Sequence, residues 1–152
     1  MNLSFFVPGI PVPKGSAKAF VVKGRAIVCQ DNAARQKPWA SSISYTAMQE
    51  MKFQKPVAGA VAISLTFHMP RPKSHYGTGS NSTLVKSSAP RQHVSKPDLD
   101  KLIRCVKDAL TGVVWNDDSQ VCRIELAEKK YETVSRGTGV TISVTTIDEH
   151  EF

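Results

Sequence analysis

The sequence predicts a single domain of α+β fold, with a mixed or mostly antiparallel sheet and two helices. Three observations predict it: apolar residues alternate in several strand-like segments, two stretches have apolar residues at helical spacing, and no internal repeat is present. A chain of 152 residues is long enough to bury a core without disulfide or metal cross-links. We therefore expect residues 1–152 to form one domain.

The strand-like segments have apolar side chains at alternate positions. The clearest is 59–69, where apolar residues alternate with smaller or polar ones over the whole length. Short apolar runs on both sides of Lys23-Gly24-Arg25 predict a hairpin with a basic turn. The expected strands and hairpin lie at 3–7, 20–28, 59–69, 120–131 and 138–147.

The first expected helix precedes the strand 59–69. It should begin at Asp31 or Asn32, which are favourable N-cap residues, and run to about Lys52. Pro38 is awkward in the early part of this stretch and could shift the start of the helix.

The second expected helix runs from about Asp98 to Leu110. Gly112 stands where a C-terminal glycine is expected. Apolar residues fall on one face, and charged residues on the other. The apolar face comprises Leu99, Leu102, Ile103, Val106 and Leu110.

Charge is distributed unevenly along the chain, whose net charge is +7. Residues 1–97 contain 13 Lys and Arg against two acidic residues, a net charge of +11, whereas residues 98–152 contain seven against 11, a net charge of −4. The basic part suggests a polyanionic partner. A divalent cation would explain why carboxylates gather beside a phosphate-binding surface. The alternative is an ordinary solvated acidic face.

Cysteine content and hydropathy indicate the compartment. The three cysteines form no CxxC pair, which is typical of a reducing cytoplasm. No apolar run approaches the roughly 18 residues of a membrane span. The opening residues predict a strand rather than a signal peptide. We expect a cytoplasmic protein without membrane contact.

The segment 70–97 interrupts the regular patterns. It is rich in Ser, Gly and Pro, and contains five basic residues and no acidic one. We expect a flexible loop that contacts DNA, because a stretch of this length without regular structure is either functional or disordered. The alternative is a tolerated linker. The residues expected to contact DNA, here and elsewhere, are Lys14, Lys73, Lys86, Arg91, Lys96, Lys101 and Lys107.

Asp98 and Asp100 stand at the entry of the second helix. Because Pro97 favours an extended conformation for the residue before it, both carboxylates could converge in front of the helix N-terminus. The alternative is structural: Ser95 would be the N-cap and Asp98 would complete a variant of the capping box.

Asp117 and Asp118 form a second acidic pair, at a junction between a loop and a strand, with no obvious helix to cap. A turn built on Asn116 and Asp117 is the alternative reading. Together with the first pair they make an oxygen-rich set of ligands that suits Mg²⁺ or Mn²⁺.

Arg104 lies one helical turn after Asp100. It could stabilise negative charge on a phosphate during hydrolysis. The alternative is a surface ion pair with Asp100, worth only about 0–1 kcal/mol.

The 26 residues KPDLDKLIRCVKDALTGVVWNDDSQV, at 96–121, resemble the signature of the RusA family of Holliday-junction resolvases. The resemblance implies a RusA-like fold and a homodimeric, magnesium-dependent endonuclease that nicks opposite strands of four-way DNA junctions in recombination and repair. It also implies that Asp98, Asp100 and Asp118 bind the metal, with Asp117 as a further candidate. Such chains are commonly encoded by phages and prophages.

Two positions depart from the family pattern. Arg104 replaces a usual lysine, and Lys101 replaces a frequent asparagine. An arginine keeps the positive charge but cannot act as a general acid. Two other functions stay open at this point: a nucleic-acid-binding protein without catalysis, and a less selective nuclease that cuts branches or flaps.

Overall fold

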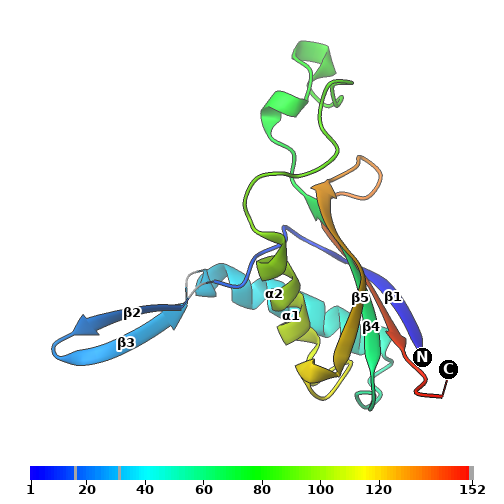
Figure 1. Cartoon of the computed structure of the whole chain (residues 1–152). Coiled ribbons are helices and arrows are strands. Elements are labelled where there is room, and N and C mark those ends of the chain that lie inside the picture. Colours follow the sequence, from blue (N-terminus) through cyan, green and yellow to red (C-terminus); the bar gives the residue numbers. More distant parts are fainter. Residues whose placement is uncertain (16, 31, 151–152) are drawn as a thin grey trace.

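The computed structural model describes residues 1–15, 17–30 and 32–150. Its main sheet has the strand order β1-β6-β4-β5 (Figure 1). β6 pairs antiparallel with β1 and β4, whereas β5 pairs parallel with β4, so the sheet is mixed as expected. The strands are β1 (Asn2–Pro8), β4 (Val61–Met69), β5 (Val121–Tyr131) and β6 (Gly139–Thr146).

The two helices, α1 (Ala33–Glu50) and α2 (Leu99–Leu110), lie together on one face of this sheet (Figure 1). Ser44 of α1 donates a hydrogen bond to the carbonyl of Ala109 at 2.7 Å, which ties the two helices to each other. The α+β fold with two helices is therefore confirmed.

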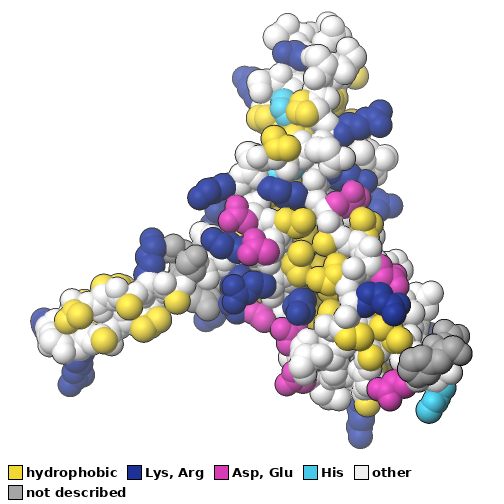
Figure 2. Space-filling view, viewed as in Figure 1, with side chains coloured by type: hydrophobic (Ala, Val, Ile, Leu, Met, Phe, Trp, Pro, Cys, Tyr) yellow, Lys and Arg dark blue, Asp and Glu magenta, His cyan; other side chains and the backbone are white. Residues whose placement is uncertain are grey.

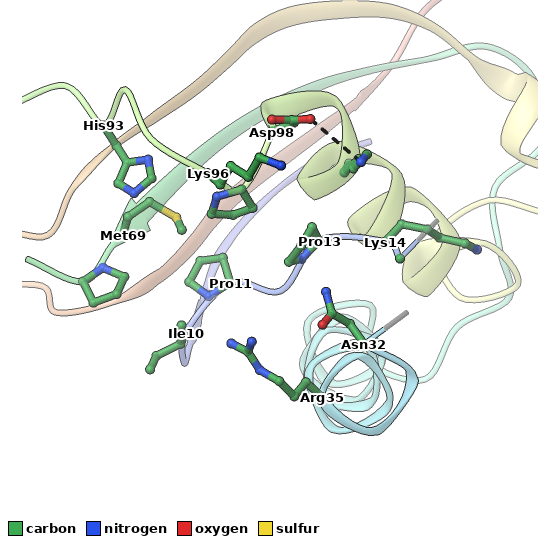
Figure 3. Close-up of a pocket in the computed structure, with 14 residues that line it drawn as sticks. Ile10, Pro11, Pro13, Lys14, Asn32, Arg35, Met69, His93, Lys96 and Asp98 are labelled. Carbon is green, nitrogen blue, oxygen red and sulfur yellow. Dashed lines mark ion pairs between the residues drawn. The ribbon is translucent and has the colours of Figure 1, made fainter. Parts of the chain in front are cut away.

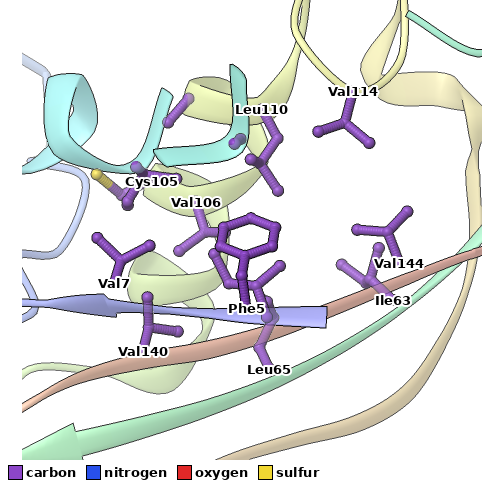
Figure 4. Close-up of a cluster of buried hydrophobic side chains, with 14 of the residues drawn as sticks. Phe5, Val7, Ile63, Leu65, Cys105, Val106, Leu110, Val114, Val140 and Val144 are labelled. Carbon is purple, nitrogen blue, oxygen red and sulfur yellow. The ribbon is translucent and has the colours of Figure 1, made fainter. Parts of the chain in front are cut away.

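The core lies between the helices and the sheet (Figure 4). Alternate residues of β4 enter it, and α2 contributes the apolar face expected from its spacing. Helical spacing also places Trp39, Ile43 and Ala47 of α1 inside. Completely buried members include Ile63, Leu65, Phe67, Leu102, Val106, Leu110 and Trp115.

The ends of the helices differ from expectation in three details. Asn32 is the N-cap of α1 but its side chain makes no capping hydrogen bond, and Asp31 lies outside the described residues. Pro38 lies inside α1 and does not shift its start, because proline removes only one hydrogen bond there and its φ suits a helix. Asp98, not Ser95, is the N-cap of α2. Gly112 follows α2 with φ 84°, as a C-terminal glycine should.

Residues 70–97 form a projecting arm, called here the 70–97 arm (Figure 1). It contains local structure: two short 3-10 helices, Lys73–His75 and Gly79–Asn81, and hydrogen bonds that link Gly77 to Leu84 and Lys86 to His75, both 2.9 Å. Its mobility stays a prediction.

The base of the arm is fixed around the ring of Tyr131, the last residue of β5. The rings of His75 and His93 pack edge-on against it at 4.8 and 5.0 Å, and the Arg71 guanidinium lies 5.1 Å from its centre. The Tyr131 amide donates to the carbonyl of Arg91 at 2.9 Å. Both ends of the arm are thus attached to the sheet.

The expected hairpin forms a separate sheet of β2 (Ala17–Val22) and β3 (Arg25–Gln30), which projects away from the body (Figure 1). Lys23 and Gly24 make its turn, both with positive φ. Within the described part of the chain, no helix is long and apolar enough to cross a membrane.

We predict that Leu102→Ala lowers the free energy of unfolding by about 2–5 kcal/mol, because it leaves a cavity under α2. Leu102 is completely buried. Urea unfolding measures the loss. The control is Leu84→Ala in the 70–97 arm, where the side chain is 60% exposed and the expected change is within about 0.5 kcal/mol. Equal losses of unfolding free energy in the two variants would show that burial of Leu102 does not anchor α2.

Candidate active site

The chain reaches α2 through a short segment that β5 holds in place. The Nζ of Lys129 donates hydrogen bonds to the carbonyls of Ser95 and Pro97, the second at 2.7 Å. Asp98 then adopts an extended conformation, with φ −68° and ψ 138°, which confirms the expected strand-like entry. Lys129 therefore determines where the first acidic residue of α2 lies.

The carboxylate of Asp98 has no structural task in α2. Although Asp98 is the N-cap residue, its side chain makes no capping hydrogen bond. Its nearest cation is Lys101, whose Nζ lies 3.9 Å from Oδ2. The structural alternative, a capping box begun by Ser95, is therefore wrong.

Asp100 and Arg104 are exposed on the polar face of α2. They are one turn apart, yet they form no ion pair within 4 Å, both being among the described residues. The structure therefore contradicts the alternative of a surface ion pair between Asp100 and Arg104. Both side chains are free to meet a ligand.

Asp117 has a capping role that the sequence did not indicate. It is the N-cap of the 3-10 helix Asp118–Gln120, called η3, and its Oδ1 accepts a hydrogen bond from the amide of Ser119 at 2.8 Å. Gln120 completes the capping box by accepting from the Asp117 amide at 2.9 Å. Hydrogen bonds from Ser119 lower the pKa of Asp117 below its usual value. Asp117 therefore stabilises the turn that presents its neighbour.

Asp118 faces α2. The Nζ of Lys107 lies 3.1 Å from its Oδ1, in an orientation that makes no hydrogen bond. This oxygen is enclosed and has no hydrogen-bond partner, although the side chain as a whole is 48% exposed. The fold thus brings the second acidic pair, Asp117 and Asp118, to the polar face of α2, the helix that begins at the first acidic pair.

The donor set fits a hard divalent cation in its chemistry, because all its donors are carboxylate oxygens and one of them, Oδ1 of Asp118, is enclosed with an ion-pair partner but no hydrogen bond among the residues described. In the structure, lysines supply the positive charge instead: Lys101 faces Asp98 and Lys107 faces Asp118. Over the residues that the structure describes, no three Asp, Glu, His or Cys side chains are close enough to hold one metal ion.

A cavity of about 440 Å³ opens beside Asp98 (Figure 3). Among the residues that the structure describes, four cations, Lys14, Arg35, Lys96 and Lys101, line it together with one carboxylate. Figure 2 shows the same arrangement on the surface, where Lys and Arg side chains surround a small group of carboxylates. The cavity therefore favours a phosphate group next to Asp98.

The other basic residues expected to contact DNA lie elsewhere. Lys73, Lys86 and Arg91 are exposed on the 70–97 arm, outside the cavity. Lys14 is at the cavity but also forms an ion pair with Asp108. A phosphate would therefore compete with Asp108 for Lys14.

Sequence reasoning missed Arg35, Lys129 and the cavity position of His93. Arg35 carried a detectable signal, since a cation in the first turn of a helix is unusual. Lys129 and His93 carried no such signal, because the residues that they contact are far from them in the sequence. Lys129, for example, lies on β5 and contacts residues 95–97.

We predict that Lys129→Met loosens the start of α2. Two hydrogen bonds to carbonyls are lost, so amides at 95–101 should exchange with deuterium faster while those of β4 are unchanged. Lys130→Met is the control, because the side chain of Lys130 pairs with Glu128, at 3.5 Å on the surface. Unchanged exchange at 95–101 in the Lys129 variant would contradict its positioning role.

Comparison with known proteins identifies the family of the chain. The family model described as "Endodeoxyribonuclease RusA" matches residues 8–145, a range that includes α2 and both acidic pairs. The chain is also similar to "Uncharacterized protein YqaN" of Bacillus subtilis (strain 168), at 29% identity over 129 residues, which is 83% of this chain and 86% of that protein. The chain belongs to the RusA family of endodeoxyribonucleases, hydrolases that act on DNA.

Proposed function

We propose that this chain is a magnesium-dependent, structure-selective endonuclease that resolves four-way DNA junctions by paired nicks. The observation that carries the proposal is the state of three carboxylates. Asp98, Asp100 and Asp118 have no capping or hydrogen-bonding task, and two of them face lysines. Such carboxylates are available to a cation, which can bridge them to a phosphate, whereas Asp117 is occupied in η3.

In the proposed reaction, Asp98, Asp100 and Asp118 would hold Mg²⁺, or Mn²⁺ as an alternative, after moving closer together than they lie in the described structure. Such an ion activates water and polarises a phosphodiester. Arg104, exposed beside Asp100, stabilises the negative charge that develops on the phosphate. Because arginine stays protonated, Arg104 acts as a cation and not as a general acid.

The basic residues form two groups that bind different parts of the DNA. Lys14, Lys96 and Lys101 bind the phosphates nearest to Asp98, since they line the same cavity. Lys73, Lys86 and Arg91 bind a more distant part of the duplex through the 70–97 arm. Lys107 neutralises Asp118 until the ligand arrives.

We also propose that the protein acts as a homodimer. A four-way junction presents two strands related by a two-fold axis, and one chain carries one set of these carboxylates. An isologous dimer supplies two equivalent sites with the required symmetry.

We predict that Asp98→Asn, Asp100→Asn and Asp118→Asn each abolish magnesium-dependent nicking of a labelled four-way junction. Binding should stay equal or tighten, because each change removes a charge that repels phosphate. Asp117→Asn should cost less, since an amide oxygen can still accept from Ser119. Asp108→Asn is the matched control, because Asp108 lies on the same helix and pairs only with Lys14.

Two further arms of this experiment decide the details of the proposal. Flap and linear duplexes at the same salt concentration should be cut far more slowly, and equal rates would indicate a less selective nuclease. A mixture of the active chain with Asp98→Asn should give junctions nicked on one strand only. Paired nicks alone would contradict a dimer with one site in each chain.

Arg104 gives a separate prediction. Arg104→Ala should lower the nicking rate by about 10²–10³, by analogy with the loss of one oxyanion donor. Arg104→Lys should retain most of the activity, because a cation suffices if no bidentate contact is needed. Single-turnover time courses measure both variants. A normal nicking rate for Arg104→Ala would show that Arg104 takes no part in the reaction.

A further inference from the structure

We propose that the cavity beside Asp98 receives one unstacked nucleotide of the junction, with its base between the apolar walls and its edge against His93. This inference rests on the proposed function, and it names the part of the substrate that the same site would recognise. The cavity would then set which sequence is cut at the junction.

The size and walls of the cavity suit a nucleotide. Its volume of about 440 Å³ lies within the range of roughly 300–1,000 Å³ that is usual for small-ligand sites. One part is apolar, and its flat proline rings and thioether can pack on a base. The apolar residues are Ile10, Pro11, Pro13, Met69, Pro70 and Pro97.

The charged part of the cavity suits the phosphate of the same nucleotide. Lys14, Arg35, Lys96 and Lys101 line it beside Asp98 (Figure 3). Phosphate alone would need these cations but no apolar walls. A neutral apolar ligand would need the walls but not the cations. A nucleotide has both parts.

His93 is the second, independent observation. Its side chain is only 8% exposed and lines the cavity, yet its Nδ1 has no hydrogen-bond partner among the residues described. Enclosed polar atoms in native proteins nearly always have a partner. The other ring nitrogen, Nε2, is already 3.4 Å from the hydroxyl of Ser95. A ligand that enters the cavity and displaces the groups enclosing Nδ1 would give this atom a partner.

The chemistry of His93 favours a base over a phosphate. Burial and, after it, the charge of Lys129 lower the pKa of His93, so the ring is neutral near pH 7. A neutral imidazole has one donor and one acceptor, which matches the edge of a base. Asn32 adds an amide on the opposite side of the cavity (Figure 3).

A junction can supply such a nucleotide at little cost. Extruding a base from a duplex costs unstacking energy, and the cost is least where pairing is already disturbed. At the crossover of a four-way junction the bases are paired, but the continuous stacking of the helices is interrupted, which lowers the unstacking cost there. Because Asp98 lines the cavity, the captured nucleotide would lie next to the phosphate that is cut.

The test places 2-aminopurine at each crossover position of a junction, bound without Mg²⁺ so that no cutting occurs. Its fluorescence should rise several-fold at one position with the unmodified chain, and less with His93→Ala. His93→Gln, which keeps a donor and an acceptor, should restore part of the signal. Lys130→Ala is the control and should leave the signal unchanged, because Lys130 pairs with Glu128 at the surface and lies outside the cavity.

Cleavage of junctions with each of the four bases at that position gives a second readout. The unmodified chain should discriminate by about 10- to 100-fold, the value of one good base contact, and His93→Ala should reduce this discrimination with unchanged junction binding. If His93→Ala does not fold, the exposed variant Asn32→Ala provides the same comparison.

A third arm separates the base from the phosphate. Deoxynucleoside monophosphates should shift the NMR signals of His93, and inorganic phosphate should not. Equal shifts would reveal a phosphate site and overturn the role given to the base. Unchanged fluorescence at every crossover position, with normal junction cutting, would overturn the inference and leave the proposed function intact. A chain that cuts no junction would contradict the proposed function itself.

Discussion

Burial of the apolar face of α2 against the sheet decides where the polar groups of this helix lie. Leu102, Val106 and Leu110 are completely enclosed, and each contributes roughly 1.5–3 kcal/mol. Rotation of the helix would expose them, so Asp100 and Arg104 are held facing outward. The helix dipole also favours carboxylates at its N-terminus. Core packing therefore supports the acidic groups of the site, which repel one another and phosphate.

Electrostatic compensation is the second constraint on this face. Carboxylates beside a phosphate-binding surface are unfavourable unless a cation stands between them. Lys101 and Lys107 provide that charge locally, and Lys14 does so for Asp108. These pairs are partly exposed and therefore weak, so a ligand of higher charge can displace the lysines. These ion pairs keep the carboxylates apart from one another, but they are weak enough for a ligand to replace them.

The cavity places the proposed nucleotide-binding site next to Asp98, at the end of α2 where the proposed reaction takes place. Its lining comes from four distant parts of the chain: the segment after β1, the start of α1, the end of β4 and the segment 93–101. Tyr131 and Lys129, both on β5, hold the last of these segments through ring contacts and carbonyl hydrogen bonds. A displacement of β5 would therefore move Asp98 and the cavity together.

The sequence by itself determined the elements and the acidic residues, because hydrophobic periodicity and capping preferences are local. It predicted β4, both helices, the hairpin and the extended entry at Asp98. Only the tertiary structure decided the parallel pairing of β4 with β5 and the meeting of Asp118 with Lys107. It alone also built the cavity around His93. These features depend on contacts between segments far apart in the chain, and no local pattern encodes such contacts.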